Sequence, residues 1–148
     1  VKRRLDIHHN IEINGNKTTV IDDYGHHPSE ILSTVNTIKS IYPYKKIFMI
    51  FQPHRYSRTE STWSDLVKIL RTLDRVIILP TYSAGERKTI YDSFFLYQKL
   101  RKKQRLLVKT LNGIYKPLIS NLASDHVLVL QGAGNIKDIL SQLIDISE

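Results

Sequence analysis

Two short polar segments hold most of the residues in this chain that could do chemistry. The first is DDYGHHP, from Asp22 to Pro28, and the second is QPHRYSRT, from Gln52 to Thr59. They gather carboxylates, imidazoles and guanidinium groups, whereas the segments before them are mostly apolar. Such groups bind polar, anionic ligands through charge-assisted hydrogen bonds, and imidazoles also exchange protons near neutral pH. The two segments therefore predict a binding site rather than a feature that the fold requires.

In the first segment, Asp22 and Asp23 follow an apolar run with the pattern of a strand. A carboxylate at the carboxyl end of a strand can accept hydrogen bonds from ribose hydroxyls, and Gly25 lets the backbone come close to a ligand. His26 and His27 cannot point the same way in most conformations, so we expect one to cap the following helix and the other to face the site. The alternative interpretation is an Asx-type cap with two surface histidines.

In the second segment, Arg55 and Arg58 are three residues apart at the expected start of a helix. They would then share one face and could clamp a single carboxylate or phosphate, and the positive end of the helix would add to that attraction. His54 lies beside them. The alternative is a polar loop whose arginines pair with Glu60 or Asp65.

Each segment stands between an expected strand and an expected helix. Two β-rich runs, 7–13 and 17–21, flank Asn14-Gly15, a strong hairpin signal because both residues tolerate positive φ. Continuous apolar runs predict buried strands at 47–51, 76–79, 106–108 and 127–130. Apolar residues at helical spacing predict helices after Pro28 and at 63–73, 92–103, 111–122 and 136–144.

This alternation predicts a Rossmann-like α/β fold, doubly wound, with a mostly parallel sheet, an N-terminal β-hairpin and helices on both faces. We expect residues 1–148 to form a single domain. The turn Gly132-Ala133-Gly134-Asn135 lacks the third glycine of a nucleotide-binding fingerprint and so predicts a tight strand–helix turn. The loop with Tyr82, Gly85 and Glu86 ends another strand and fits either a wall of the same site or a plain turn.

The composition excludes several classes of protein. Without cysteine the chain has neither a disulfide framework nor a thiolate metal site, which agrees with a reducing cytoplasm. No run approaches the roughly 18 apolar residues of a membrane helix, and the histidines and carboxylates lack zinc spacing. The net charge of +8 fits an anionic partner. Much of the excess lies at 99–105, for which we expect a solvated helix end and turn, with an electrostatic patch as the alternative.

The two polar segments, in this order and spacing, resemble the carboxy-terminal domain of the Mur ligases, and among them the UDP-N-acetylmuramate–L-alanine ligases of peptidoglycan synthesis. The opening VKRR, the loop YSAGE at 82–86 and the turn GAGNI at 132–136 are similar to that family too. Pro80 departs from it, since an acidic residue often precedes the loop. The resemblance implies a cytoplasmic enzyme of three domains, and a chain that opens on Val1 fits a piece of it.

The resemblance implies an ATP-dependent ligase. An amino-terminal domain would hold the UDP-sugar, and a central P-loop domain would hold ATP and Mg²⁺. An acyl phosphate formed on UDP-N-acetylmuramate would then be attacked by the amine of L-alanine. This chain contains no Gly-x-x-x-x-Gly-Lys-Ser/Thr sequence and no expected metal ligand, so we expect it to be inactive alone. The resemblance implies neither a nucleic acid nor a membrane as a partner.

The same resemblance implies roles for individual residues. The nucleotide-binding residues would be Arg4, Asp22 and Asp23. The residues around the amino-acid substrate would be Tyr24, His26, His54, Arg55 and Arg58. His26 is the candidate catalytic residue, because a neutral imidazole can orient the amine or accept its proton. A small amino acid offers little apolar area, so arginines on its carboxylate must supply most of its orientation.

Other functions stay open on the sequence. A sister ligase that recycles a whole tripeptide onto the same sugar shares the DDxxHHP pattern but lacks the HRYSR pattern found here at 54–58. A stand-alone Rossmann-like module for nucleotide or nucleic acid would use the basic segment 99–105, and steep salt dependence of binding would identify it. A phosphate-binding regulatory domain is a third alternative.

Overall fold

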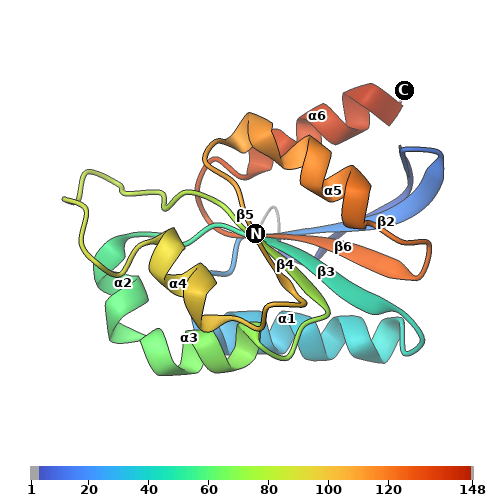
Figure 1. Ribbon diagram of the computed structural model, residues 1–148. Coiled ribbons are helices and arrows are strands. Elements are labelled where there is room, and N and C mark those ends of the chain that lie inside the picture. The colour runs from blue at the N-terminus through green and yellow to red at the C-terminus, as the bar shows by residue number, and fades with distance from the viewer. Residues whose placement is uncertain (1–3, 148) are drawn as a thin grey trace.

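The computed structural model describes residues 4–147, so Val1 to Arg3 of the family-like opening lie outside the described residues. Its strands are β1 (Asp6–Ile13), β2 (Asn16–Asp23), β3 (Lys46–Phe51), β4 (Arg75–Ile78), β5 (Arg105–Leu107) and β6 (His126–Gln131). They form one sheet in the order β1-β2-β6-β3-β4-β5 (Figure 1). β1 is antiparallel to β2, and the other neighbouring strands are parallel. The mostly parallel sheet with an entry hairpin is confirmed.

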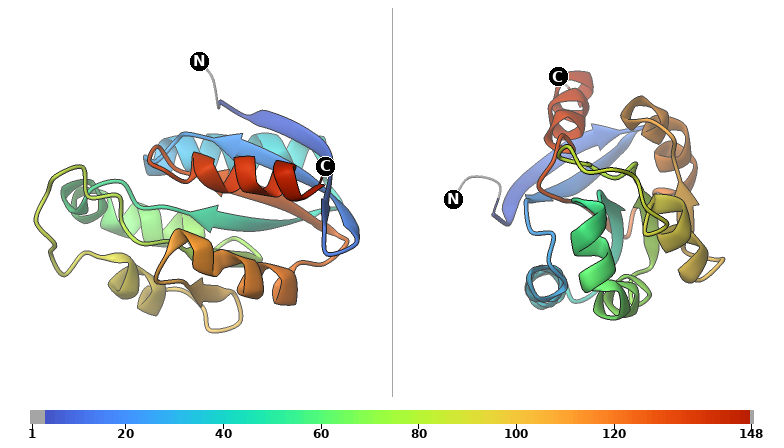
Figure 2. Two further views of the ribbon diagram at one scale, coloured as in Figure 1. Left: turned by 90° about the horizontal axis from the view of Figure 1, so that it is seen from above. Right: turned by 90° about the vertical axis from the view of Figure 1, so that its left-hand side faces the viewer.

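Helices cover both faces of this sheet. They are α1 (Pro28–Ile41), α2 (Tyr56–Ser61), α3 (Trp63–Leu70), α4 (Ser93–Lys99), the 3-10 helix η1 (Leu111–Ile114), α5 (Tyr115–Asn121) and α6 (Lys137–Ser147). The right-hand view of Figure 2 shows α6 above the sheet and α1 and α3 below it. The doubly wound arrangement is therefore confirmed. Within residues 4–147 no helix has the length and apolar content needed to cross a membrane.

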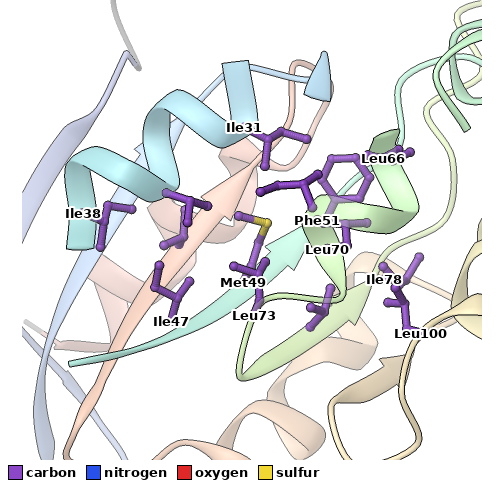
Figure 3. Packing of buried hydrophobic residues seen from close by; sticks show 14 of the residues in the cluster. Ile31, Ile38, Ile47, Met49, Phe51, Leu66, Leu70, Leu73, Ile78 and Leu100 are labelled. Atoms are coloured by element: carbon purple, nitrogen blue, oxygen red, sulfur yellow. The ribbon is translucent and has the colours of Figure 1, made fainter. Parts of the chain in front are cut away.

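The central strand β3 packs against a core on each side. Ile47, Met49 and Phe51 belong to the core shared with α1, α3 and α4, shown in Figure 3. Phe48 and Ile50 belong to the core shared with α5 and α6. Successive side chains of a strand point to opposite faces. A continuous apolar run is therefore what a strand with helices on both faces requires.

The turn between β1 and β2 is the Asn14-Gly15 pair. Its two residues have positive φ, 49° at Asn14 and 81° at Gly15, and Ile13 pairs with Asn16 across the turn. A two-residue hairpin turn with both φ values positive matches the twist of the strands that it joins. The hairpin expected from the sequence is confirmed.

The helix predicted at 92–103 is shorter than expected. It ends as α4 at Lys99, because the buried side chain of Gln104 accepts the N–H of Arg101 and donates to the carbonyl oxygens of Leu70 and Leu73. These bonds hold 101–104 in a turn. Two other predicted helices also differ: 63–73 ends at Leu70 as α3, and 111–122 divides into η1 and α5.

The basic segment 99–105 contributes side chains to this turn. Arg101 Nη2 donates to the carbonyl oxygen of Leu73 at 2.9 Å. The guanidinium of Arg105 stands 4.5 Å from the centre of the Tyr97 ring. These arginines therefore make contacts within the fold. This favours the interpretation of the segment as a helix end and turn.

Candidate functional site

The two polar segments meet at one edge of the sheet. β6 lies between β2 and β3, and its last residue, Gln131, is in register with Asp23 of β2 and Phe51 of β3. Three parallel strands therefore end side by side, and each continues into a loop that leads to a helix. Open α/β sheets place their ligands at this edge.

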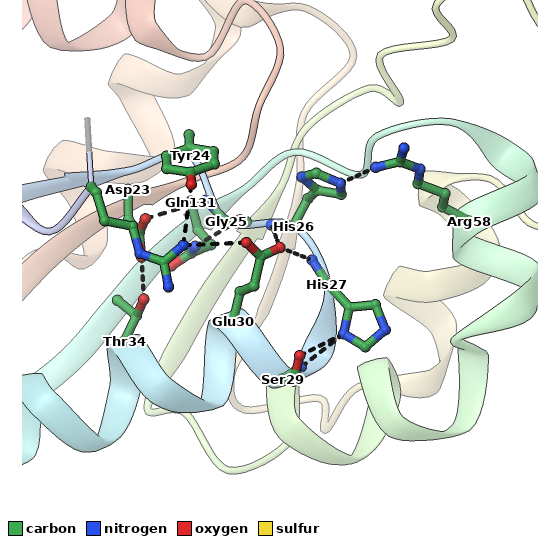
Figure 4. A network of polar contacts seen from close by, with 11 residues as sticks. Asp23, Tyr24, Gly25, His26, His27, Ser29, Glu30, Thr34, Arg58 and Gln131 are labelled. Carbon is green, nitrogen blue, oxygen red and sulfur yellow. Dashed lines mark hydrogen bonds and ion pairs between the residues drawn. The ribbon is translucent and has the colours of Figure 1, made fainter. Parts of the chain in front are cut away.

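The two adjacent histidines have different partners. His27 Nδ1 accepts the N–H of Ser29 at 3.1 Å, and Glu30 Oε1 accepts the N–H groups of His26 and His27 at 3.3 and 3.1 Å (Figure 4). This reciprocal capping closes the first turn of α1. His26 instead points its ring toward Arg58. The helix cap expected from one of the two histidines is confirmed, and the ring of the other lies beside Arg58.

Asp23 is buried and bound by the protein itself. Its exposed fraction is 0%, its Oδ1 accepts the N–H of Gly25 at 3.2 Å, and its Oδ2 accepts the hydroxyl of Thr34 (Figure 4). Asp22 is also buried. Asp23 thus fixes the loop that follows β2, and the nucleotide-binding role expected for the two aspartates stays a prediction.

Gly25 is crowded by its own chain. A Cβ at this position would lie 3.0 Å from Glu30 Cβ and 3.2 Å from Gln131 Nε2. Gln131 Nε2 also donates to the carbonyl oxygen of Gly25 at 2.7 Å. Close packing within the protein therefore favours glycine here, and the approach of a ligand to this backbone stays a prediction.

Arg4 and Tyr24 meet beside Glu30. Arg4 Nη1 lies 3.2 Å from Glu30 Oε2 and 3.4 Å from the Tyr24 hydroxyl oxygen. Burial works to raise the pKa of Glu30, but the N–H groups of His27 and His26 and the charge of Arg4 outweigh it, so this pKa lies below its ordinary value. Glu30, which sequence reasoning did not single out, thus joins Arg4, expected at the nucleotide, to the backbone of His26, expected at the amino acid.

His26, His54 and Arg58 line a cavity of about 360 Å³, to which Phe51 and Leu66 add apolar surface. The ring centres of His26 and His54 are 5.0 Å apart, and Arg58 Nη1 contacts His26 Nε2. A guanidinium donates hydrogen bonds and does not accept them. His26 Nε2 must therefore carry the lone pair, which leaves the proton of the neutral ring on Nδ1.

The imidazoles of His26 and His54 are neutral near pH 7. Burial lowers the pKa of His26, and the charge of Arg58 lowers it further. Burial also lowers the pKa of His54, and the neighbouring His26 and Arg58 add to that effect. A neutral imidazole keeps a lone pair that can accept a proton from an amine.

Three buried nitrogens at this edge lack a hydrogen-bond partner in the described part of the chain: His26 Nδ1, His54 Nδ1 and Arg55 Nε. An unpaired buried donor costs roughly 1–3 kcal/mol, so a ligand with acceptor atoms would stabilise the site. Arg58 lines the cavity, whereas Arg55 does not. Arg55 precedes α2 with a φ of 68°. The structure thus brings one arginine of the expected clamp into the cavity with the two histidines.

The loop after β4 lies against His54. Tyr82 N donates to the carbonyl oxygen of Pro53 at 2.9 Å, and Arg55 N donates to that of Tyr82 at 2.8 Å. The rings of Tyr82 and His54 stack with their centres 5.4 Å apart. Glu86 in the same loop reaches the first turn of α2. The loop that the sequence left open between site wall and plain turn therefore belongs to the surroundings of the site.

The turn at 132–135 packs on Gln52. Gln52 Oε1 accepts the N–H of Ile136 at 3.1 Å, and Gln52 Nε2 donates to Asn135 Oδ1 at 2.6 Å. A Cβ on Gly134 would lie 2.6 Å from Gln52 Oε1 and 2.7 Å from Tyr82 Cγ. The glycine therefore serves close packing in a tight strand–helix turn, as predicted.

Known proteins resemble this chain over most of its length. The model of the family described as Mur ligase, glutamate ligase domain, matches residues 3–134. The UDP-N-acetylmuramate–L-alanine ligase of Buchnera aphidicola subsp. Acyrthosiphon pisum (strain Tuc7) is 41% identical over 129 residues, which are 84% of this chain and 27% of that protein.

Two solved structures share the fold. The UDP-N-acetylmuramate-alanine ligase of Thermotoga maritima gives a TM-score of 0.74 at 26% identity and covers 99% of this chain and 30% of its own. A murein peptide ligase from Psychrobacter arcticus gives a TM-score of 0.72 at 17% identity, with the same coverage of 99% and 30%.

The chain spans 27% of the length of the Buchnera relative. The family match includes both polar segments, the loop after β4 and most of the glycine turn that packs on it. The chain therefore belongs to the Mur ligase family and matches its glutamate ligase domain.

Proposed function

We propose that this chain is the carboxy-terminal, amino-acid-binding domain of an ATP-dependent ligase that joins L-alanine to UDP-N-acetylmuramate. The observation that carries the proposal is the cavity in which His26 and His54, each with a buried and unpartnered Nδ1, lie with Arg58. The carboxylate of an amino acid supplies acceptors for the N–H of His26 Nδ1 and for the guanidinium of Arg58. The names of the relatives support L-alanine as that amino acid.

The charge of the cavity suits a small zwitterion. With the His26 and His54 imidazoles neutral, Arg58 attracts the carboxylate while neither of these two rings repels the ammonium group. Phe51 and Leu66 offer apolar surface to a methyl group. The apolar contact of one methyl group is small, so the carboxylate must supply most of the orientation.

In the proposed reaction, ATP converts the muramoyl carboxylate to an acyl phosphate, and the amine of L-alanine attacks its carbonyl carbon. The ammonium group must first lose a proton. In the free domain Arg58 binds His26 Nε2. When the substrate carboxylate takes over this guanidinium, the lone pair of His26 becomes free to accept the proton. The tetrahedral intermediate then expels phosphate and leaves the amide.

The rest of the enzyme belongs to the same proposal. Arg4, Asp22 and Asp23 would contact the nucleotide when this domain closes over a central ATPase domain, and an amino-terminal domain would hold the UDP-sugar. In residues 4–147 no group of three or more His, Asp or Glu side chains is arranged to hold a metal ion. We therefore assign Mg²⁺ mainly to ligands of the central domain. We further propose that the enzyme works in the cytoplasm, where ATP is available.

Replacing the cavity arginine tests the carboxylate contact. In the full-length protein, Arg58→Ala should raise the KM for L-alanine by about one to two decades, because a charge-assisted hydrogen bond is worth roughly 1.5–3 kcal/mol. The KM for ATP should change little. We expect Arg55→Ala to act in the same direction, since Arg55 Nε is buried and unpaired at this edge. The measurement is ATP-dependent phosphate release with UDP-N-acetylmuramate as the acceptor.

Arg87→Ala is the matched control, because Arg87 is exposed and lies outside the cavity. Equal effects of Arg58→Ala on the KM values of both substrates would count against the carboxylate contact. Turnover with the tripeptide but not with L-alanine would move the assignment to the recycling ligase. If the full-length protein turns over neither substrate, the stand-alone binding module becomes the favoured assignment.

A further inference from the structure

Helix α2 begins without a cap from its own N-cap residue. Arg55 makes no side-chain hydrogen bond to the first turn, and it is not one of the residue types that normally cap helices. The N–H groups of a first turn have no partner within the helix. Tyr56 and Ser57 therefore need an acceptor from elsewhere in the chain.

Glu86, about thirty residues further along the chain, is that acceptor. Its Oε1 accepts the N–H of Tyr56 at 2.8 Å and the N–H of Ser57 at 3.1 Å. Its Oε2 accepts the hydroxyl of Ser57. The Ser57 hydroxyl, followed by the N–H groups of Ser57 and Tyr56, keeps the pKa of Glu86 below its ordinary value. The carboxylate is thus ionised at neutral pH and bound through both oxygens to the helix.

The loop backbone directs Glu86 toward α2. Ala84 and Gly85 have φ values of 50° and 88°, and Glu86 N donates to the carbonyl oxygen of Ser83 at 3.0 Å. Two successive left-handed residues reverse the chain within one tight turn. The left-handed conformation is unfavourable for Ala84, because its Cβ restricts positive φ values that glycine adopts freely. The loop is therefore shaped to return toward the helix that follows β3.

We propose that Glu86 is a positioning residue for the amino-acid site, which holds Arg58 in the cavity by fixing the first turn of α2. Arg58 directly follows Ser57, whose N–H and hydroxyl both bind Glu86. The direction of the Arg58 side chain therefore depends on the turn that Glu86 closes. The inference rests on the proposed function, since it concerns the same carboxylate contact.

Glu86→Ala tests the inference in two ways. In the 148-residue chain, the amide protons of Tyr56 and Ser57 should exchange faster with solvent. In the full-length protein, the KM for L-alanine should rise about 2- to 30-fold, the range that corresponds to the loss of a side-chain N-cap. The KM for ATP should stay within about twofold, because the cap is local to α2.

Two further variants separate positioning from folding. Glu86→Gln keeps a carbonyl oxygen for both N–H groups and an amide that can donate to the Ser57 hydroxyl, so it should restore most of the affinity for L-alanine. Glu60→Ala removes the same charge from an exposed residue of α2 and should change neither quantity. Unaltered exchange in Glu86→Ala, or an unaltered KM for L-alanine, would overturn the inference.

The experiment distinguishes failure of the proposed function from failure of the positioning role. If the unmodified full-length protein does not use L-alanine, the proposed substrate is wrong, and the positioning role falls with it. The exchange rates at Tyr56 and Ser57 then still decide whether Glu86 caps α2. If the unmodified protein uses L-alanine and Glu86→Ala has the same KM for L-alanine, only the positioning role is wrong.

Discussion

His26 and His27 are neighbours in the chain, yet their rings work in different places. His27 Nδ1 accepts a backbone N–H and helps to close the first turn of α1. His26 lies 5.0 Å from the ring of His54 and binds Arg58. The contact with an obligatory donor selects the His26 tautomer that keeps a lone pair on Nε2. His27 thus closes the start of α1, while His26 holds a proton-accepting nitrogen in the cavity.

The pKa of His26 gives a test at this scale. Burial and the charge of Arg58 hold it below the ordinary value of 6.5. Arg58→Ala removes the second cause, so the pKa should move up toward that value. An NMR titration of the ring carbon signals in the 148-residue chain measures it, with Arg87→Ala as the control of equal charge. An unchanged pKa in Arg58→Ala would show that the guanidinium does not act on this ring.

The sign of the linked effect on stability follows from the same shift. The unfolded chain takes up a proton on His26 near pH 6.5, whereas the folded chain resists protonation until a lower pH. The unfolded state therefore binds more protons in this window, and the free energy of unfolding falls as the pH drops through it. In Arg58→Ala this contribution to acid destabilisation should be smaller.

The sequence predicted which polar residues lie at strand ends. It could not predict which distant residues form hydrogen bonds with them. The sequence placed Asp23 at the end of a strand and made it a ligand candidate. It could not reveal that Thr34, in the second turn of α1, gives its hydroxyl to that carboxylate. Glu86 was likewise named only as part of a loop, although the missing cap before Tyr56 was a readable signal that an acceptor was needed.

At the scale of elements, the apolar patterns predicted which segments form strands and helices along the chain, while helix ends depended on single side chains. The continuous apolar runs marked β3, β4 and β6 because those strands are buried on both faces. The end of α4 was wrong because Gln104 binds backbone groups from another part of the fold. Tertiary hydrogen bonds of this kind leave no periodic pattern in the sequence.

The turn between β6 and α6 gives a prediction at this scale. Gly134→Ala should lower the free energy of unfolding by about 1–3 kcal/mol, the usual effect of overpacking. The added methyl would meet Gln52 Oε1 at 2.6 Å and Tyr82 Cγ at 2.7 Å. Urea unfolding followed by the fluorescence of the single tryptophan, Trp63, measures the change.

Gly113→Ala is the control for this glycine. A Cβ there would come no closer than 3.3 Å, to Thr110 Oγ1, so its loss of stability should be clearly smaller. Equal losses in the two variants would mean that the contact of the 132–135 turn with Gln52 and Tyr82 does not require a glycine.

At the scale of the whole molecule, the two ends of the sheet have different roles. The carboxyl ends of β2, β3 and β6 carry the cavity and its histidines. At the opposite end, His126 Nε2 binds Asp74 Oδ2 at 2.8 Å, and its Nδ1 accepts the N–H of Ala123. That histidine has partners on both nitrogens and serves the fold. The unpaired imidazole nitrogens of the cavity favour the other edge as the place where the proposed ligand binds.

The last prediction concerns the 148-residue chain by itself. It should unfold in one cooperative transition, because β3 contributes residues to both cores and so couples their stability. It should nevertheless release no phosphate from ATP with UDP-N-acetylmuramate and L-alanine, since its sequence contains no P-loop to bind the triphosphate. Trp63 fluorescence and circular dichroism during urea unfolding test the first statement, and phosphate release tests the second, with the full-length protein as the positive control. Two separate transitions would contradict the shared core. Turnover by this chain alone would mean that the ATP site lies within it, and the three-domain proposal would have to be abandoned.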